Sequence, residues 1–290
     1  MVKLAVRKLP GAAGCEIEGL DLRWLDDSAF DTIEMALHEH LVAILPSQSI
    51  GPKSFLGLAQ RFGTPEPHVI DQFHHKVDPN ILILSNRVDE KGEPRGLADG
   101  GTYFHSDYSY LPVPARCTLL YAQEIPRSGA GTTFANQRLA YEELPETTKE
   151  RIGGLVVRHH YGNRDNLDAA SRTAASKLND AQKAKMDWVR HPLVRRHPHT
   201  GRQSLYAVSG SSFGIEGMGD NEGRALLDDL KAHATAGKYL STPKYRPGDV
   251  IIWDNCSLLH SAPLIDASEP RTLWRITVKE QGPTVKRAGR

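Results

Sequence analysis

His105, Ser106 and Asp107 place an imidazole and a carboxylate two residues apart, within the stretch GGTYFHSDYSYLP. On an extended backbone, residues two apart point to the same side. Two ligands can therefore reach one metal ion without a long loop. A second imidazole would complete the triad of two histidines and one carboxylate, which holds iron(II) on one face and leaves three positions open.

The far end of the chain supplies groups that could complete this triad. His260 follows the apolar strand pattern VIIWD, and Arg271 and Arg275 come after it. Residues four apart share a face of a strand, so the two arginines should lie side by side. Two buried guanidinium groups are costly unless each meets an anion. For Arg275, a structural ion pair with Asp266 or Glu280 is the alternative to an anionic ligand.

Composition excludes several classes of partner. The 290 residues carry 36 Lys and Arg against 35 Asp and Glu, so no basic excess indicates binding to nucleic acid or to an anionic membrane. Three scattered cysteines disfavour a disulfide framework and a zinc ribbon. The N-terminus has no apolar run of signal-peptide length, and we expect a cytoplasmic protein.

Apolar spacing predicts a mixed but mainly β chain. Helical spacing favours helices from about residue 28, from Pro52 to Phe62 and from Asn221 to Ala234. After residue 100 most strands are short and separated by Pro or Gly turns, which favours a sandwich or barrel over a parallel sheet. No repeat or flexible linker divides the chain. We expect one domain over residues 1–290, with a surface insertion around residues 161–190.

The motifs together resemble those of a known enzyme family. His105-Ser106-Asp107, the WDN turn at residues 253–255, His260 and Arg271 look like the iron(II)/2-oxoglutarate dioxygenases related to taurine dioxygenase and 2,4-dichlorophenoxyacetate dioxygenase. The similarity runs through most of the chain, from GCEIEGLDLRWLDD to RTLWRITV. It implies a mostly β fold with peripheral helices around a double-stranded β-helix, which is a jelly-roll, cupin-like core.

The resemblance also implies a cofactor set. His105, Asp107 and His260 match the ligands of Fe(II), and 2-oxoglutarate and O2 are the co-substrates. Arg271 matches the arginine that binds the distal carboxylate of 2-oxoglutarate, and Thr132 matches the threonine that shares this carboxylate. A guanidinium suits this role because it can hold a carboxylate through two charge-assisted hydrogen bonds.

Four residues are candidates for contact with the substrate. Arg275 matches the position that holds the anionic group in taurine dioxygenase, and His68 matches another substrate contact there, although it could be a plain loop histidine. Tyr108 and Tyr110 flank Asp107 and are candidates for the pocket wall. Gly101 stands where the taurine enzyme has an asparagine that contacts substrate. The remaining histidines that we considered lack a site-like spacing, and we expect them to be structural or exposed: His74, His75, His159, His160, His197 and His199.

We therefore expect hydroxylation of a C–H bond of a small anionic organic substrate, giving succinate and CO2. The segment from HPLVRRHPHTGRQSLYAV to GRALLDDLKAHAT is closer to the aryloxyalkanoate branch than to the taurine branch, and taurine or an alkylsulfonate is the alternative substrate. Two alternatives of another class are a zinc hydrolase, with a zinc-bound water as nucleophile, and a non-catalytic cupin-like binding protein. We also expect a homo-oligomer.

Overall fold

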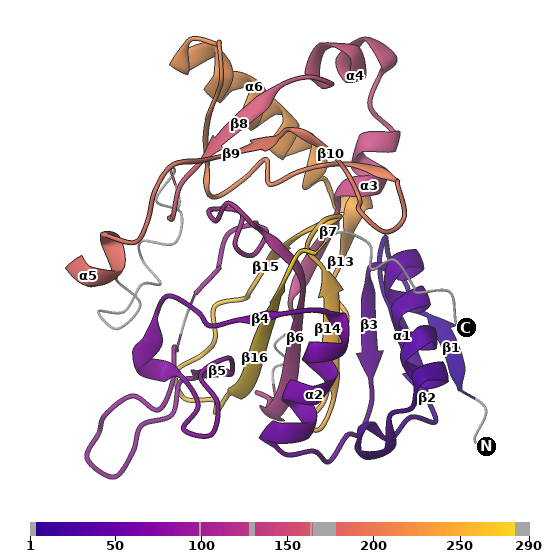
Figure 1. Ribbon diagram of the computed structural model, residues 1–290, viewed down its shortest axis with the longest axis vertical. Coiled ribbons are helices and arrows are strands. Elements are labelled where there is room, and N and C mark those ends of the chain that lie inside the picture. Colours follow the sequence, from indigo (N-terminus) through magenta and orange to yellow (C-terminus); the bar gives the residue numbers. More distant parts are fainter. Residues whose placement is uncertain (1–3, 99, 128–130, 163, 165–177, 282–290) are drawn as a thin grey trace, which may run out of the picture.

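Two long strands, β6 (Ala115–Glu124) and β16 (Thr272–Lys279), pair along their length in the middle of the largest sheet. The computed structural model describes residues 4–281 except 99, 128–130, 163 and 165–177. In that part of the chain the large sheet has the order β1-β2-β3-β14-β6-β16-β4, and β5 also pairs with β16 (Figure 1). Its other strands are β1 (Ala5–Lys8), β2 (Cys15–Glu18), β3 (Val42–Leu45), β4 (Pro65–Glu66), β5 (Leu82–Ser85) and β14 (Val250–Asp254).

Two helices cover the outer face of this sheet. They are α1 (Asp27–His40) and α2 (Pro52–Phe62), whose apolar sides pack on the side chains of Leu119 and Ile276. Both helices confirm the sequence prediction. The helix α1 begins one residue earlier than expected, because Asp26 is the residue that accepts a hydrogen bond from the backbone N–H of Ala29.

A smaller sheet of order β13-β7-β15 lies on the other side of the large sheet. It consists of β7 (Thr133–Asn136), β13 (Leu240–Ser241) and β15 (Leu258–Ser261). Apolar side chains from both sheets, including Leu120, Phe134 and Trp253, form one core between them. Successive side chains of a strand face opposite sides, so each central strand contributes one set to this inner core and one set to the helices. The space between the sheets is where polar side chains of β6 and β16 gather.

Most of the remaining helices and strands lie in the part of the molecule drawn at the top of Figure 1, whereas the short helix α5 is drawn at the left. They include α6 (Asp220–Ala234), which packs on an apolar cluster containing Leu226, Leu227 and Leu259. The others are α3 (Gln137–Glu142), α4 (Glu146–Ile152), α5 (Asp180–Lys183), β8 (Val156–His159), β9 (Val189–Pro192), β10 (Val194–Arg196), β11 (Gln203–Leu205) and β12 (Ser212–Ile215).

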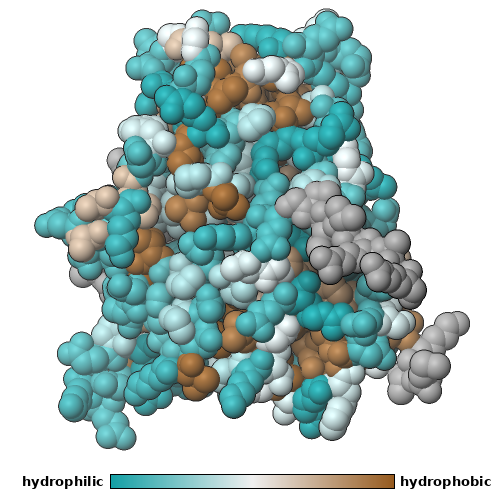
Figure 2. All heavy atoms as spheres, viewed as in Figure 1, coloured by the Kyte–Doolittle hydropathy of each residue, from teal (hydrophilic) through white to brown (hydrophobic). Residues whose placement is uncertain are grey.

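The architecture agrees with the prediction of a mostly sheet-built chain with peripheral helices. Much of the insertion expected around residues 161–190 lies outside the described residues, so the insertion and the single domain stay predictions. Among the described residues, no helix is both long and apolar enough to cross a membrane. The face seen in Figure 2 is mainly hydrophilic, and its hydrophobic residues form small separate groups.

One stability prediction follows from His159, a fully buried histidine of β8 whose two ring nitrogens have no hydrogen-bond partner among the described residues. Burial, helped by the nearby charges of His191 and Arg195, lowers the pKa of His159 from 6.5 to about 3. His159 therefore takes up a proton below about pH 6.5 in the unfolded chain but only below about pH 3 in the folded chain. The free energy of unfolding falls as the pH is lowered between these two values. In His159→Phe, we expect thermal unfolding temperature to fall less between pH 7 and pH 4.5 than in the wild type. An equal or steeper fall in the variant would contradict this account.

Candidate active site

The site begins with a backbone contact between two distant segments. His105 and His260 form an isolated antiparallel bridge, in which the N–H of His105 donates to the carbonyl of His260 (3.0 Å) and the N–H of His260 donates back (2.8 Å). The sequence pattern assumed a regular extended strand around Asp107. Instead, the chain turns directly after His105, and Tyr108 has a left-handed backbone with φ of 54°.

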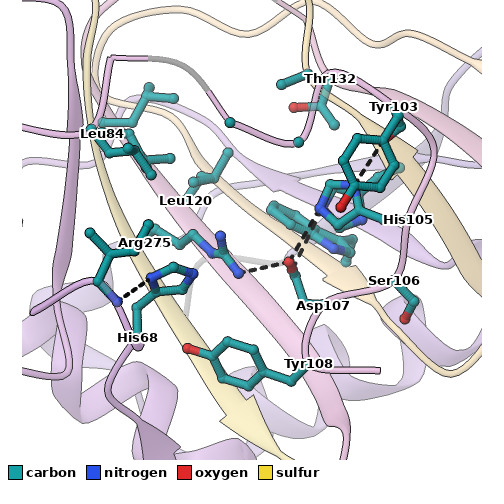
Figure 3. A pocket seen from close by; sticks show the side chains of 18 of the residues that line it. His68, Leu84, Tyr103, His105, Ser106, Asp107, Tyr108, Leu120, Thr132 and Arg275 are labelled. Atoms are coloured by element: carbon teal, nitrogen blue, oxygen red, sulfur yellow. Dashed lines mark hydrogen bonds and ion pairs between the residues drawn. The ribbon is translucent and has the colours of Figure 1, made fainter. Parts of the chain in front are cut away.

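The turn still brings the three predicted ligands together. The Nε2 atom of His105 lies 3.7 Å from Oδ1 of Asp107, and Nε2 of His260 lies 3.6 Å from Oδ2 of the same carboxylate. Figure 3 shows Asp107 at the centre of this group, with the imidazole of His105 beside it. One potential ligand atom from each residue lies within 4.8 Å of the others, which is a spacing that a single metal ion can bridge.

The two imidazoles are in forms that can bind a metal. The carbonyl oxygen of Tyr103 lies 2.8 Å from Nδ1 of His105 and accepts the proton on that nitrogen. This contact leaves the lone pair of Nε2 directed at Asp107. For His260, burial lowers the pKa of the ring to about 3, so the ring is neutral at pH 7. The donor set of two imidazoles and one carboxylate fits iron(II).

Gly101 makes room for the first of these imidazoles. Its backbone has φ of +66°, and a Cβ atom there would lie 2.4 Å from Cε1 of His105. No L-residue with a side chain fits this position unless His105 moves. The glycine that stands in the place of a substrate-contacting asparagine therefore has a structural reason in this chain.

A hydrogen-bonded network holds the carboxylate of Asp107. Thr118, on β6, donates its hydroxyl to Oδ2 of Asp107 at 2.6 Å. Asn255 donates to the Thr118 hydroxyl (2.9 Å) and accepts from the backbone N–H of Asp107 (3.2 Å). The side-chain oxygen of Asn255 also accepts from the indole of Trp253. Such outer contacts orient a ligand and tune its affinity for metal.

A guanidinium takes the remaining side of the carboxylate. Arg275, on β16, donates from Nη2 to Oδ1 of Asp107 at 2.7 Å; the Asp107 side chain is buried and that of Arg275 is 14% exposed. Burial alone would raise the pKa of Asp107, but the charge of Arg275 and the adjoining imidazoles hold this pKa well below its usual range. The pairing partners considered from the sequence were wrong, since Glu280 pairs with Arg195 and Asp266 accepts hydrogen bonds from Ser268.

Arg271 and Thr132 line the same cavity as the His–Asp–His group. Arg271 is 6% exposed and donates from Nη2 to the carbonyl of Ala98 at 3.0 Å. The hydroxyl of Tyr245 lies 3.1 Å from the Thr132 hydroxyl and 3.2 Å from its backbone nitrogen. A guanidinium and two hydroxyls at one end of a buried cavity can bind a carboxylate.

The other end of the cavity carries the predicted substrate contacts. His68, Tyr108 and Tyr110 line it, and Figure 3 shows His68 and Tyr108 on the far side of Arg275 from Thr132. The cavity has a volume of about 150 Å³. Nδ1 of His68 accepts from the backbone N–H of Ile70 (3.1 Å), so the proton lies on Nε2. Burial, and then the charge of Arg275, lowers the pKa of His68 to about 3, which keeps this ring neutral.

Comparison with known proteins decides what this site belongs to. Residues 5–277 match the family model described as taurine catabolism dioxygenase TauD, TfdA family. The chain belongs to this family. It is 34% identical, over 84% of each chain, to the alpha-ketoglutarate-dependent 2,4-dichlorophenoxyacetate dioxygenase of Burkholderia sp. (strain RASC). It is 28% identical to the (S)-phenoxypropionate/alpha-ketoglutarate-dioxygenase of Sphingobium herbicidovorans, over 93% of this chain and 92% of that one.

A solved structure supports the same family assignment. The crystal structure of AAD-2 in complex with Mn(II) and N-oxalylglycine is 30% identical, with a TM-score of 0.78, and covers 98% of this chain and 100% of its own. This TauD/TfdA protein is therefore an iron(II)- and 2-oxoglutarate-dependent dioxygenase that uses O2. The family assignment excludes the two alternatives that the sequence alone left open, a zinc hydrolase and a non-catalytic binding protein.

Sequence reasoning missed three residues of the site. Thr118, on β6, and Tyr245, just before the turn that leads into β14, are outside the recognisable motifs and give no spacing signal of their own. Asn255 belongs to the WDN turn that carries the resemblance, but only the fold shows that it contacts both Asp107 and Thr118.

A conservative change at Thr118 tests the network around Asp107. Thr118→Val keeps the shape of the side chain but removes the donor to Asp107, so we expect metal affinity to fall about 10–100-fold. Thr118→Ser keeps the hydroxyl and should bind metal nearly as the wild type does. Anaerobic calorimetric titration with Mn²⁺ measures both, and circular dichroism checks the fold. A valine variant with wild-type affinity and fold would show that this hydrogen bond does not position the carboxylate.

Proposed function

We propose that this dioxygenase hydroxylates a C–H bond of a small organic monoanion with an aromatic or other apolar body, of the aryloxyalkanoate type. One atom of O2 enters the substrate and the other enters succinate, as 2-oxoglutarate loses CO2. The relatives that act, by name, on phenoxypropionate and 2,4-dichlorophenoxyacetate support this class. The charges that line the cavity support it independently.

The charge balance of the cavity is the observation that carries the proposal. Among the described lining residues, Asp107, Arg271 and Arg275 are charged, so the walls carry one net positive charge. A bound Fe²⁺ and a 2-oxoglutarate dianion cancel each other. A monoanionic substrate would bring the buried site to neutrality, whereas a neutral or cationic substrate would leave an uncompensated charge away from water.

For the cofactors, we assign His105, Asp107 and His260 as the iron ligands. Arg271 and Thr132, joined by Tyr245, would bind the distal carboxylate of 2-oxoglutarate. Bound iron and 2-oxoglutarate supply the oxidising power when O2 is present. The protein's part is to orient both groups, to keep the His105 lone pair on Nε2, and to exclude water from the reacting C–H bond.

For the substrate, we assign Arg275 and His68 as the anion contacts. In the described part of the chain, Nη1 of Arg275 donates no hydrogen bond, while its Nη2 binds Asp107 and Thr277. Nε2–H of His68 is a second donor. Tyr108 and Tyr110 would then hold the apolar body by their ring faces. A second cavity of about 390 Å³ is also lined by His68, Tyr108 and Tyr110, so these three residues form a wall shared by the two cavities.

The same lining disfavours taurine as the substrate. Taurine carries an ammonium group as well as a sulfonate, and its overall charge is zero. The one carboxylate among the described lining residues is that of Asp107, and it already accepts hydrogen bonds from Arg275 and Thr118. At Gly101, a side chain that could contact the ammonium group has no room.

Three further expectations remain proposals. Two facing sheets with the metal-binding residues between them are what a double-stranded β-helix core provides, and we propose that core here, supported by the likeness to AAD-2. A homo-oligomer can be tested by light scattering after size-exclusion chromatography. A cytoplasmic location can be tested by cell fractionation.

Arg271→Lys tests the assignment of the co-substrate site. Lysine keeps the charge but cannot form two parallel hydrogen bonds to one carboxylate, so we expect the KM for 2-oxoglutarate to rise at least about tenfold. The KM for the organic substrate should change much less. Succinate formation measured against each substrate in turn separates the two constants. Equal increases in both, or none, would contradict the assignment.

A substrate panel tests the proposed function itself. We expect succinate formation above the substrate-free level with aryloxyacetates and aryloxypropionates, and release of the phenol when the carbon next to the ether oxygen is hydroxylated. Neutral amides or esters of the same acids serve as matched controls, because they keep the ring and lose the anion. Equal turnover of acids and neutral controls, or turnover of taurine in preference to both, would overturn the proposal.

A further inference from the structure

A second cluster of metal-binding side chains lies outside the catalytic cavity, where the end of α1 meets the turn between β10 and β11 (Figure 1). Glu34 and His38 are four residues apart on α1 and therefore share one face of the helix. His199 comes from the turn, and its ring stacks on that of His38 with centroids 5.5 Å apart. One potential ligand atom from each of these three residues lies within 4.8 Å of the others.

The turn that carries His199 is anchored by a buried neighbour. Nδ1 of His197 accepts the backbone N–H groups of His199 and Thr200, each at 3.1 Å. Nε2 of His197 donates to Asp254 at 2.8 Å, and both of these side chains are buried. The position of His199 is therefore set by the protein before any ion arrives, which lowers the entropic cost of binding.

One ring nitrogen of His199 lacks a hydrogen-bond partner in the described part of the chain. This nitrogen, Nε2, is buried. A buried polar atom of this kind destabilises the folded chain unless something binds it. We propose that Glu34, His38 and His199 bind a divalent transition-metal ion, with Zn²⁺ and Co²⁺ as the best-suited ions. Two imidazoles and a carboxylate are a usual ligand set for such ions.

The electrostatics around the cluster favour neutral imidazoles. Burial, followed by the charge of His197, lowers the pKa of His38, while burial and then the charge of Arg116 lower that of His199 to about 4. Arg116 also pairs with Oε1 of Glu34. This contact orients the carboxylate and leaves Oε2 for an ion, but the guanidinium charge opposes a cation. We therefore expect weaker binding than in a structural zinc site.

A neighbouring group, His197, Asp254 and Cys256, also has close donor atoms, but it is already satisfied. Both nitrogens of His197 are used, and Oδ1 of Asp254 accepts the backbone N–H groups of Cys256 and Ser257. Burial raises the pKa of the Cys256 thiol well above its usual value, which disfavours the thiolate that binds a metal. We assign no site there.

Calorimetric titration of the metal-free full-length chain with Co²⁺ tests the proposal. Wild-type protein should bind two ions per chain, one in the catalytic cavity and one at Glu34, His38 and His199. His199→Ala should bind one ion and keep the same catalytic rate of succinate formation. Asp107→Ala combined with His260→Ala should also bind one ion, and Co²⁺ should raise its unfolding temperature by a few degrees.

His40→Ala is the matched control, since His40 lies on the same helix but outside the cluster. It should bind two ions. One ion per chain in the wild type would overturn the proposal, as would a second ion that His199→Ala retains. Far-ultraviolet circular dichroism establishes that each variant is folded, and a second ion lost equally in His40→Ala and His199→Ala would also count against the cluster.

Discussion

The buried carboxylate of Asp107 is the group on which the rest of the site depends. It lies within reach of two imidazoles, receives a hydroxyl from Thr118 and pairs with the guanidinium of Arg275. A carboxylate without these partners would take up a proton at this depth rather than stay charged. Its partners therefore do more than orient it: they keep it in the ionised form that a divalent metal needs.

The sheet explains how such distant residues meet. Thr118 on β6 is directly opposite both Thr277 on β16 and Trp253 on β14, and Arg275 is opposite Leu120. Because side chains alternate along a strand, Thr118, Thr277 and Arg275 all face the space between the sheets, while Leu119 and Ile276 face α1 and α2. The same alternation that buries the apolar core thus delivers a row of polar groups to one cavity.

Features of the fold that depend on neighbouring residues could be predicted from the sequence, whereas features that depend on contacts between distant segments could not. Local patterns were sufficient for α2, which begins at Pro52 and ends at Phe62 as expected, and for the strand at Val250. The grouping of His105, Asp107 and His260 came from the family resemblance, which rests on motifs at both ends of the chain, and the fold brings these three residues together. Local patterns were wrong for the backbone after His105, because the bridge to His260 and the left-handed Tyr108 depend on tertiary contacts.

Long-range partners were beyond the sequence for a physical reason. Arg275 could pair with any of several carboxylates, and nearby Asp266 and Glu280 were reasonable choices by distance along the chain. The observed partner, Asp107, is 168 residues away in the turn before β6, where contacts with Thr118 and Asn255 hold it next to Arg275. Tyr245 illustrates the same limit, since its hydroxyl meets Thr132 from a position 113 residues away and the residue belongs to no motif.

The position of Arg275 has a consequence for the proposed reaction. One guanidinium binds the metal-ligating carboxylate through Nη2 and, in our proposal, the substrate anion through Nη1. In a cavity of low dielectric constant these two contacts share one positive charge, so each weakens the other. An anion that binds at Nη1 would leave more negative charge on Asp107 for the metal. Substrate binding and metal coordination are then linked through a single side chain, and the linkage requires no movement of the backbone.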